Sequence, residues 1–231
     1  MLNWKTQNGY IIKLIKAGIT NCYLIEYENT CILVDTGQKR AYAKLQAFLN
    51  GNLRNLNLNY ILQTHTHYDH AGNTKKIRDK FHARVIVHEK EAECLSKGFT
   101  TLPKGTNIVT KIISNSGNRY ASWIGEYENV EPDIIVNSDY LIDENPTLQI
   151  IETPGHTAGS VSLIIDNEIA LVGDTLFGIV PEKAFPPFAD NEKDLFESWE
   201  KLLNTNCRLF LPAHGKALTR EIIKKELKKR K

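Results

Sequence analysis

The sequence lacks the features that mark a membrane protein, a secreted protein or a strongly basic nucleic-acid binder. No apolar run approaches the length of a membrane span, and residues 1–5 do not have the charged-then-apolar form of a signal peptide. The formal net charge is only +2 over 231 residues, which gives no field that would attract nucleic acid or an anionic membrane. The composition therefore predicts no membrane partner, disfavours nucleic acid, and leaves the oligomeric state open.

Cysteine is scarce, with four residues in the chain and no Cys-x-x-Cys pair among them. Cys22 and Cys31 fall in strand-like runs, and Cys207 precedes another such run. This placement favours buried free thiols in a reducing cytoplasm, so we expect a cytoplasmic protein. A disulfide between Cys22 and Cys31 across a hairpin is the alternative.

The sequence has no Gly-x-Ser-x-Gly motif, but it gathers metal-ligand residues in one place. His65, His67, Asp69 and His70 fall within six positions, directly after the apolar run 60–62. Imidazole and carboxylate suit zinc, and also iron or manganese. The alternative is a polar loop at a strand end, but a cluster this dense predicts bound metal.

The spacing within this cluster predicts two sets of ligands. Residues two apart in extended chain project to the same side, so His65 and His67 can bind one ion together. Asp69 and His70 follow a turn toward a helical pattern, and we expect them to face elsewhere and to hold a second ion.

Three later segments repeat one pattern, in which an apolar run ends at a ligand residue beside glycine. Rigid strand ends hold ligands in place, as a metal site requires. Each segment alone is weak evidence, because an aspartate after glycine is more often a turn residue. The three ligand candidates are His156, Asp174 and His214.

Together these residues resemble the ligand set of the metallo-β-lactamase superfamily of binuclear metallohydrolases, over roughly residues 20–215. Residues 33–37, Leu-Val-Asp-Thr-Gly, match a further motif of that superfamily. The resemblance implies an α/β (α+β) fold, the αββα four-layer sandwich. It implies that Asp35 orients a ligand histidine without binding metal itself, for which a turn-forming role before Gly37 is the alternative. The implied ligands are His65, His67 and His156 for metal one, and Asp69, His70 and His214 for metal two, with Asp174 bridging.

The implied cofactors are two zinc ions, with iron or manganese possible. Two ions about 3.5–4 Å apart can share a bridging hydroxide, which is the nucleophile that the residues predict. Asp69 is the expected catalytic residue, because one of its oxygens can bind metal while the other takes part in proton transfer. The expected reaction is cleavage of a small ester, thioester, lactone or phosphoester.

The resemblance also reduces the range of expected substrates. Asp174 stands where β-lactamases of this fold generally have another residue, which argues against antibiotic hydrolysis. Only seventeen residues follow His214, too few for the helical substrate domain of the glyoxalase II branch. Two alternatives remain: a persulfide dioxygenase with a single iron at the first site, and an RNA- or partner-binding protein that uses the basic tail 219–231.

The pattern along the chain predicts one domain over residues 1–231, with strands and helices on either side of an irregular insertion at about 97–131. We interpret that insertion as a cover over the site; the alternative is a partly helical packing element. The loop 177–190 is expected to form the mouth of the site. The residues expected to contact substrate are Tyr68, Phe177, Phe185 and Phe188, with Trp123 as a further aromatic in the insertion. A packed loop aromatic is the alternative for Tyr68, and a core plug for the phenylalanines.

Overall fold

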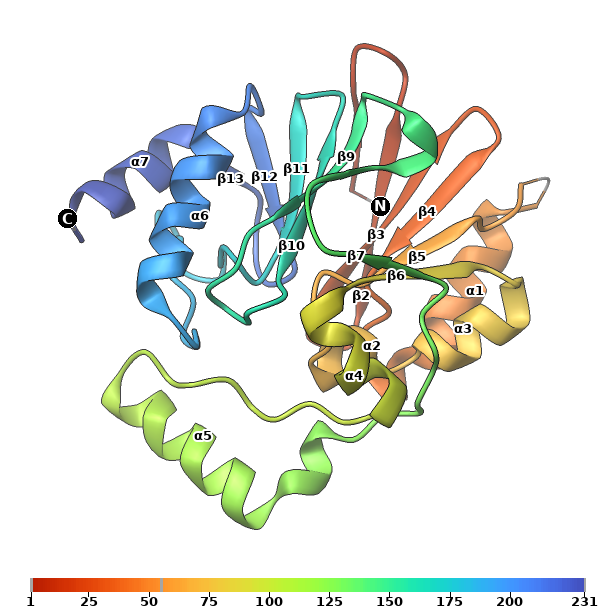
Figure 1. The fold of residues 1–231 in the computed structure, drawn as a ribbon. Coiled ribbons are helices and arrows are strands. Elements are labelled where there is room, and N and C mark those ends of the chain that lie inside the picture. The colour runs from red at the N-terminus through yellow and green to blue at the C-terminus, as the bar shows by residue number, and fades with distance from the viewer. Residues whose placement is uncertain (1, 55, 231) are drawn as a thin grey trace. The chain divides into compact units, whose positions relative to one another are not determined.

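The computed structural model describes residues 2–54 and 56–230. The chain divides into two compact units, which are described in turn (Figure 1). Unit 1 comprises residues up to 100 together with 123–137, and unit 2 comprises 101–122 together with the residues from 138 onward. Within the described ranges, no helix is both long enough and apolar enough to cross a membrane.

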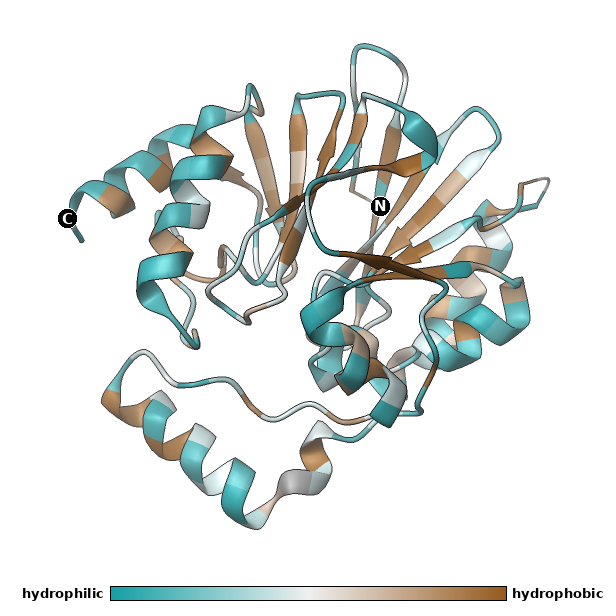
Figure 2. Ribbon diagram, in the orientation of Figure 1, coloured by the Kyte–Doolittle hydropathy of each residue, from teal (hydrophilic) through white to brown (hydrophobic). Residues whose placement is uncertain are grey.

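The described residues of unit 1 form a seven-stranded sheet in the order of the sequence. The first four strands make an antiparallel meander, and the last four run parallel to one another. Figure 2 shows the parallel strands largely apolar, and the inner ones are almost entirely buried, whereas the first strand of the sheet is mostly exposed. The strands are β1 (Asn3–Lys5), β2 (Ile11–Ala17), β3 (Thr20–Tyr27), β4 (Thr30–Val34), β5 (Tyr60–Leu62), β6 (Arg84–His88) and β7 (Ile134–Val136).

Helices connect the parallel strands of unit 1 and pack on one face of its sheet. Leu45 and Leu95 join Leu24, Leu33 and Val85 in one buried apolar cluster, so the helices and the sheet share a core. The helices are η1 (Lys39–Ala41), α1 (Tyr42–Asn52), α2 (Tyr68–Ala71), α3 (Thr74–Phe81) and α4 (Glu89–Lys97); η2 (Ser122–Gly125) precedes the return to this unit.

Unit 2 is built on a six-stranded sheet in the order β13-β12-β11-β10-β9-β8. The adjacent residues Asp166 and Asn167 are a hairpin turn signal in the sequence, and both have positive φ, 56° and 52°, as a type I′ turn between β10 and β11 requires. The strands are β8 (Tyr140–Leu141), β9 (Leu148–Glu152), β10 (Val161–Ile165), β11 (Ile169–Gly173), β12 (Leu209–Pro212) and β13 (Leu218–Thr219).

Two amphipathic helices cover one face of the unit 2 sheet. Trp199 and Leu195 from one helix and Ile223 from the other share a buried cluster with Val172 and Phe210 of the sheet. The apolar stripe of the basic C-terminal segment is therefore a packing face, as predicted for an ordinary surface helix. The helices of this unit are α5 (Ile108–Tyr120), η3 (Ile142–Glu144), α6 (Glu192–Asn204) and α7 (Arg220–Lys228).

Strand direction brings the predicted ligand loops to one edge of each sheet. In unit 1, β4 and β5 are parallel, so the loops that follow Val34 and Leu62 leave the sheet at the same edge. In unit 2, β9 and β11 both run antiparallel to β10, and β12 is parallel to β11. The three loops that carry His156, Asp174 and His214 therefore start from the same edge of that sheet.

The main strands and helices predicted from periodicity are confirmed to within a few residues. The segment 97–131 is not irregular throughout as expected: it contains α5, so the partly helical alternative is correct, although no periodicity located the helix. The hydrophobic pattern of α5 is inverted: the buried positions are Thr110 and Ser114, whereas Ile108, Val109 and Ile112 are 79%, 65% and 61% exposed. A search for an apolar stripe facing a core cannot find such a helix. The short elements β1, β8, β13 and α2 were also not predicted, because two to four residues carry little periodic signal.

The favoured prediction of buried free thiols is confirmed for Cys22, Cys31 and Cys207, and the alternative of a disulfide between Cys22 and Cys31 is wrong. The cysteines are free, and Cys31 lies opposite Glu26 of β3, four residues along that strand from Cys22. A separation of four residues in a strand is about 13 Å, whereas a disulfide needs Cα atoms within about 7 Å. Burial raises the pKa of the Cys31 thiol to about 11, which suits an unreactive core residue.

Candidate metal centre

In unit 1 the predicted ligands lie between the end of β5 and the short helix α2. His65 and His67 are in the loop that follows Leu62, and their rings are nearly perpendicular with centroids 4.6 Å apart. Their ligand nitrogens lie within 4.8 Å of each other, so both imidazoles can reach one ion. The prediction that this histidine pair shares a direction is therefore confirmed.

Asp69 and His70 occupy α2, and their ligand atoms lie within 4.8 Å of each other, so they form a second pair beside the first. The ring of His70 lies 3.9 Å from that of His65, centroid to centroid, because the single turn of α2 folds the chain back on the loop. The Nε2 atom of His70 is 4.0 Å from Oδ2 of Asp69. Both histidines are fully buried and Asp69 is 7% exposed, so the ligands of unit 1 form one compact buried group.

Asp35, at the end of β4, orients this group. Its Oδ2 accepts hydrogen bonds from Nδ1 of His70 at 2.8 Å and from the Thr64 hydroxyl at 2.8 Å, and its Oδ1 accepts from the Thr64 backbone N–H at 2.9 Å. Its φ of 60° is the left-handed conformation, which aspartate tolerates better than most residues. Asp35 therefore forms a turn and also holds a candidate ligand, so both roles considered for it apply.

The tautomers of His65 and His70 follow from these contacts. The single hydroxyl proton of Thr64 is donated to Asp35, so its oxygen accepts from Nδ1 of His65, 3.1 Å away. The carboxylate of Asp35 can only accept from Nδ1 of His70. Both rings then carry their proton on Nδ1, and Nε2 keeps the lone pair that a metal ion needs.

The Asp69 carboxylate is also held by a neighbour. The Thr20 hydroxyl, at the start of β3, donates to Oδ2 of Asp69 at 3.2 Å. Thr20 is fully buried, so this donor is fixed by the core of unit 1. The contact orients the Asp69 carboxylate beside His70.

In unit 2, α6 anchors the loops that carry His156 and Asp174. Ser198 donates to the carbonyl of Pro154 at 2.6 Å, two residues before His156. The indole N–H of the fully buried Trp199 donates to the carbonyl of Thr175 at 2.7 Å, directly after Asp174. One helix thus fixes two of the candidate ligand loops.

Two glycines allow the ligand turns of unit 2 to pack closely. Gly155 has a φ of 130°, and a Cβ there would collide with the backbone of Leu195 in α6. Gly215 has a φ of 92°, and a Cβ there would collide with the backbone of Gly178. The glycine flanking of the ligands, noted in the sequence, therefore serves both left-handed backbone and close contact.

Asp174 lies between two histidines of unit 2. Its Oδ2 is 3.5 Å from Nε2 of His156, and its Oδ1 is 3.4 Å from Nε2 of His214. These distances are long for charge-assisted hydrogen bonds. They match the spacing of about 3.3 Å between two ligands bound tetrahedrally at about 2.0–2.1 Å from zinc. Each oxygen of Asp174 thus lies at ligand-to-ligand distance from a different histidine.

His156 has the same tautomer as the two histidines of unit 1. Its Nδ1 lies 3.0 Å from the carbonyl oxygen of Phe188, which can only accept, so Nδ1 carries the proton and Nε2 faces Asp174. Residues 104–106 hold the Phe188 loop in turn: Lys104 N–H donates to the Asp190 carboxylate at 3.0 Å, and Thr106 N–H donates to the carbonyl of Pro187 at 3.0 Å. The imidazole and carboxylate groups, together with these histidine tautomers, are therefore suited to binding a metal ion.

The aromatic residues expected to contact substrate lie in different surroundings. The ring of Phe177 stacks on His214 with centroids 4.8 Å apart. Phe185 instead packs against Phe196 and Trp199 of α6, with the Arg230 guanidinium 3.7 Å from its centroid. This packing favours the core-plug alternative for Phe185.

The remaining aromatics are only partly buried or exposed. Phe188 is half-buried and reaches the site through its carbonyl. Tyr68, on α2, packs partly against the core of unit 1, and burial raises the pKa of its phenol, which therefore stays protonated. Trp123 is 68% exposed.

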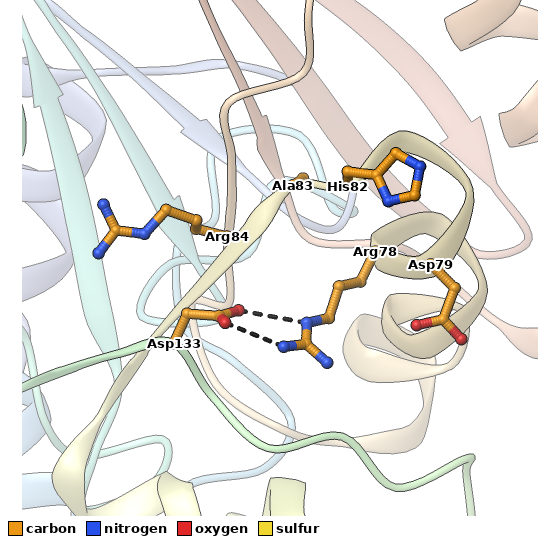
Figure 3. Close-up of a pocket in the computed structure, with 6 residues that line it drawn as sticks. All are labelled: Arg78, Asp79, His82, Ala83, Arg84 and Asp133. Atoms are coloured by element: carbon orange, nitrogen blue, oxygen red, sulfur yellow. Dashed lines mark hydrogen bonds and ion pairs between the residues drawn. The ribbon is translucent and has the colours of Figure 1, made fainter.

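A pocket of about 330 Å³ in unit 1 lies away from these ligands. Figure 3 shows Arg78 and Asp133 facing each other across it, joined by two hydrogen bonds of 3.2 and 2.9 Å. Arg84 begins β6 and Asp133 precedes β7, so the pocket lies at the opposite edge of the parallel strands from the ligand loops. The ion pair occupies this pocket and ties α3 to the sheet.

Comparison with known proteins places the chain in a family. The model of the metallo-beta-lactamase superfamily matches residues 15–214, which include every ligand candidate. A protein of Methanocaldococcus jannaschii named "Probable metallo-hydrolase" is 33% identical over 213 residues, covering 89% of this chain and 92% of that protein. The chain belongs to the metallo-beta-lactamase superfamily.

Two further proteins are similar to this chain in sequence or in fold. An N-acyl homoserine lactonase of a Bacillus species is 30% identical over 179 residues, which cover 64% of this chain and 58% of the lactonase. A solved structure of an archaeal superfamily protein from Sulfolobus tokodaii has a TM-score of 0.68 at 22% identity, covering 94% of this chain and 85% of that one. The predicted fold class is confirmed: the chain has two sheets with helices and the metallo-β-lactamase fold.

Several residues that support the site were not found from the sequence. Thr20, Thr64 and Trp199 act through hydrogen bonds to ligands or to ligand loops, and each is far in sequence from at least one group that it contacts. Only Thr64 carried a local signal, because it precedes the first ligand histidine. The carbonyl of Phe188 is a backbone contact that no residue pattern announces.

Proposed function

We propose that the chain is a metal-dependent hydrolase that binds two metal ions, zinc in the first instance with iron or manganese as alternatives. In this proposal His65, His67 and His156 hold the first ion, and Asp69, His70 and His214 hold the second. Asp174 is shared by both. The proposal rests on the complete ligand set and on membership of the superfamily.

The observation that carries the proposal is the placement of Asp174 between His156 and His214. A carboxylate that gives one oxygen to each of two histidine Nε2 atoms, at 3.5 and 3.4 Å, has the arrangement of a ligand that two ions share. The Nδ1 contacts of His65, His70 and His156 support it further, because each uses Nδ1 as a donor and leaves Nε2 directed to the site.

The bound ions would supply Lewis-acid polarisation of the substrate and a water molecule of lowered pKa. The protein's own groups would do the rest. Thr20 fixes one oxygen of Asp69, so this carboxylate can orient the attacking water and accept its proton. Asp35 keeps the proton of His70 on Nδ1 and so keeps its Nε2 a ligand.

For the substrate we propose a small molecule with an ester-type bond, such as an ester, thioester, lactone or phosphoester. The similarity to a lactonase supports this class, since a lactone is a cyclic ester. The segments 97–131 and 177–190 are proposed to frame the mouth of the site within a single domain. We also propose that the protein is located in the cytoplasm.

The test is a panel of thioesters, lactones and phosphodiesters with metal-quantified protein. We expect turnover of at least one class, lost after chelation and restored by added metal. Two alternatives have distinct outcomes. A single iron per chain with oxygen-dependent persulfide turnover would support the dioxygenase. Loss of RNA or partner binding on removal of residues 219–231, with hydrolysis intact, would support the binding protein.

Phe177 and Phe185 are expected to respond differently to replacement by alanine. Phe177→Ala removes the ring stacked on His214 and should raise KM roughly tenfold or alter substrate preference, since burial of one ring is worth roughly 1.5–3 kcal/mol. Phe185→Ala should lower the melting temperature and leave the kinetics of the folded protein unchanged. Steady-state kinetics with thermal melts measures both. Equal kinetics in Phe177→Ala and the wild type on all active substrates would contradict the assignment.

A further inference from the structure

A buried carboxylate in unit 1 has no place in the ligand set described above. Glu91 lies in the first turn of α4, is only 4% exposed, and points to the ligand loop rather than to solvent. Its Oε2 accepts a hydrogen bond from the backbone N–H of Thr66 at 2.9 Å and another from the Thr66 hydroxyl at 2.6 Å. Burying a carboxylate costs free energy unless it is well hydrogen-bonded, so a specific role accounts for it best.

Thr66 is the residue between His65 and His67. Its backbone N–H, its hydroxyl and its carbonyl are all hydrogen-bonded, to Glu91 or to Thr100. Its N–H belongs to the peptide unit that joins it to His65, and this N–H is bound by Glu91. Its carbonyl belongs to the peptide unit that leads to His67, and it accepts from the Thr100 hydroxyl at 2.7 Å. Both peptide planes beside Thr66 are therefore fixed, and with them the directions in which the two histidines project.

These contacts continue as a chain behind Thr66. Each hydroxyl has a single proton: Thr66 donates to Glu91, and Thr100 donates to the Thr66 carbonyl. The Tyr127 hydroxyl donates to the carbonyl of Cys94 at 3.1 Å and lies 2.8 Å from the Thr100 hydroxyl. Burial raises the pKa of the Tyr127 phenol, which keeps it a donor. Thr100 is itself paired by its backbone to Gly125 at 3.1 Å, so the far end of the chain is anchored.

We propose that Glu91 is a positioning residue for the first metal site: it fixes Thr66 and thereby holds His65 and His67 at the separation at which both bind one ion. This inference rests on the proposed function. It predicts that removing the Glu91 carboxylate weakens the first site more than the second, because Asp69 and His70 are held by Thr20 and Asp35 instead.

The test uses the full chain and measures zinc affinity with a competing chromophoric chelator, together with the visible spectrum of the cobalt-substituted protein. Glu91→Ala should weaken zinc binding at the first site by roughly 10–100-fold, as typical for loss of a group that orients metal ligands, and should change the cobalt spectrum. Glu91→Gln keeps an oxygen that can accept from Thr66, so its affinity should lie closer to the wild type. Thr66→Val keeps the N–H but loses the hydroxyl, so its zinc affinity should lie between those of Glu91→Ala and Glu91→Gln.

Glu226→Ala is the matched control. Glu226 is 1% exposed in α7 of unit 2, where it is paired with Lys229 at 2.9 Å, and it has no contact with the ligands in this account. This variant should lose thermal stability but keep wild-type zinc affinity and cobalt spectrum. If Glu91→Ala does not fold, the other two variants make the same test, because Thr66→Val should bind zinc more weakly than Glu91→Gln.

Wild-type affinity and spectrum in the folded Glu91 and Thr66 variants, with only a lower melting temperature, would overturn the inference and leave the proposed function intact. A wild-type chain that binds no metal would overturn the proposed function and the inference with it.

Discussion

His67→Ala and His214→Ala should each reduce hydrolysis by at least 100-fold, but by emptying different metal sites. Loss of an outer-shell group typically costs 10–100-fold in metal affinity or activity, and loss of a direct ligand should cost at least as much. His67 is paired with His65 in unit 1, so its removal should empty the first site. His214 faces Oδ1 of Asp174 in unit 2, so its removal should weaken mainly the second.

The measurement is zinc content and turnover of each purified variant after equilibration with a limiting amount of metal. His88→Ala is the control, because His88 is also a buried histidine of unit 1, 1% exposed, but caps α4 and belongs to neither ligand group. It should lose some stability and keep both ions. Near-normal turnover in His67→Ala or His214→Ala, on a substrate that the wild type hydrolyses, would exclude that residue as a ligand.

Replacing Asp35 should damage both the metal site and the fold of unit 1. Asp35→Ala leaves the Thr64 N–H, the Thr64 hydroxyl and Nδ1 of His70 without their buried acceptor. Each unsatisfied buried group costs about 1–3 kcal/mol, so the loss in unfolding free energy should be about 3 kcal/mol or more. Left-handed backbone adds about 1–2 kcal/mol of strain for alanine.

Asp35→Asn separates these effects. Asparagine tolerates the left-handed backbone but offers one acceptor oxygen and one donor group where aspartate offers two acceptors. It should therefore fold, while binding metal about 10–100-fold more weakly. Asp143→Ala is the backbone control, because Asp143 has a similar φ of 53° but is exposed in η3. Denaturant melts and zinc titrations compare the three variants. Wild-type zinc affinity in Asp35→Asn would show that Asp35 acts only as a turn residue.

The sequence was sufficient for the candidate ligands because their signal is local. His65, His67, Asp69 and His70 share one short segment, and the later ligands follow apolar strands beside glycine. Strand ends and glycine turns are set by neighbouring residues, so these positions can be predicted without the fold. The hairpin at Asp166 and Asn167 was predictable for the same reason.

Long-range contacts explain what could not be predicted. Glu91 lies 25 positions from Thr66 and Thr20 lies 49 from Asp69, so only the packed structure shows that they meet. The direction of His70 depended on the single turn α2, which is too short to read from periodicity. Phe185 and Phe177 lie in one loop, yet one packs on α6 and the other on His214.

A binuclear site in which two metal ions share Asp174 can be tested by counting and locating the ions. Elemental analysis of the folded wild-type protein after saturation with zinc gives their number, and anomalous scattering gives their positions. We expect two ions per chain, with one oxygen of Asp174 bound to each. One ion per chain under metal-replete conditions, with Asp174 turned away from it, would exclude the binuclear site.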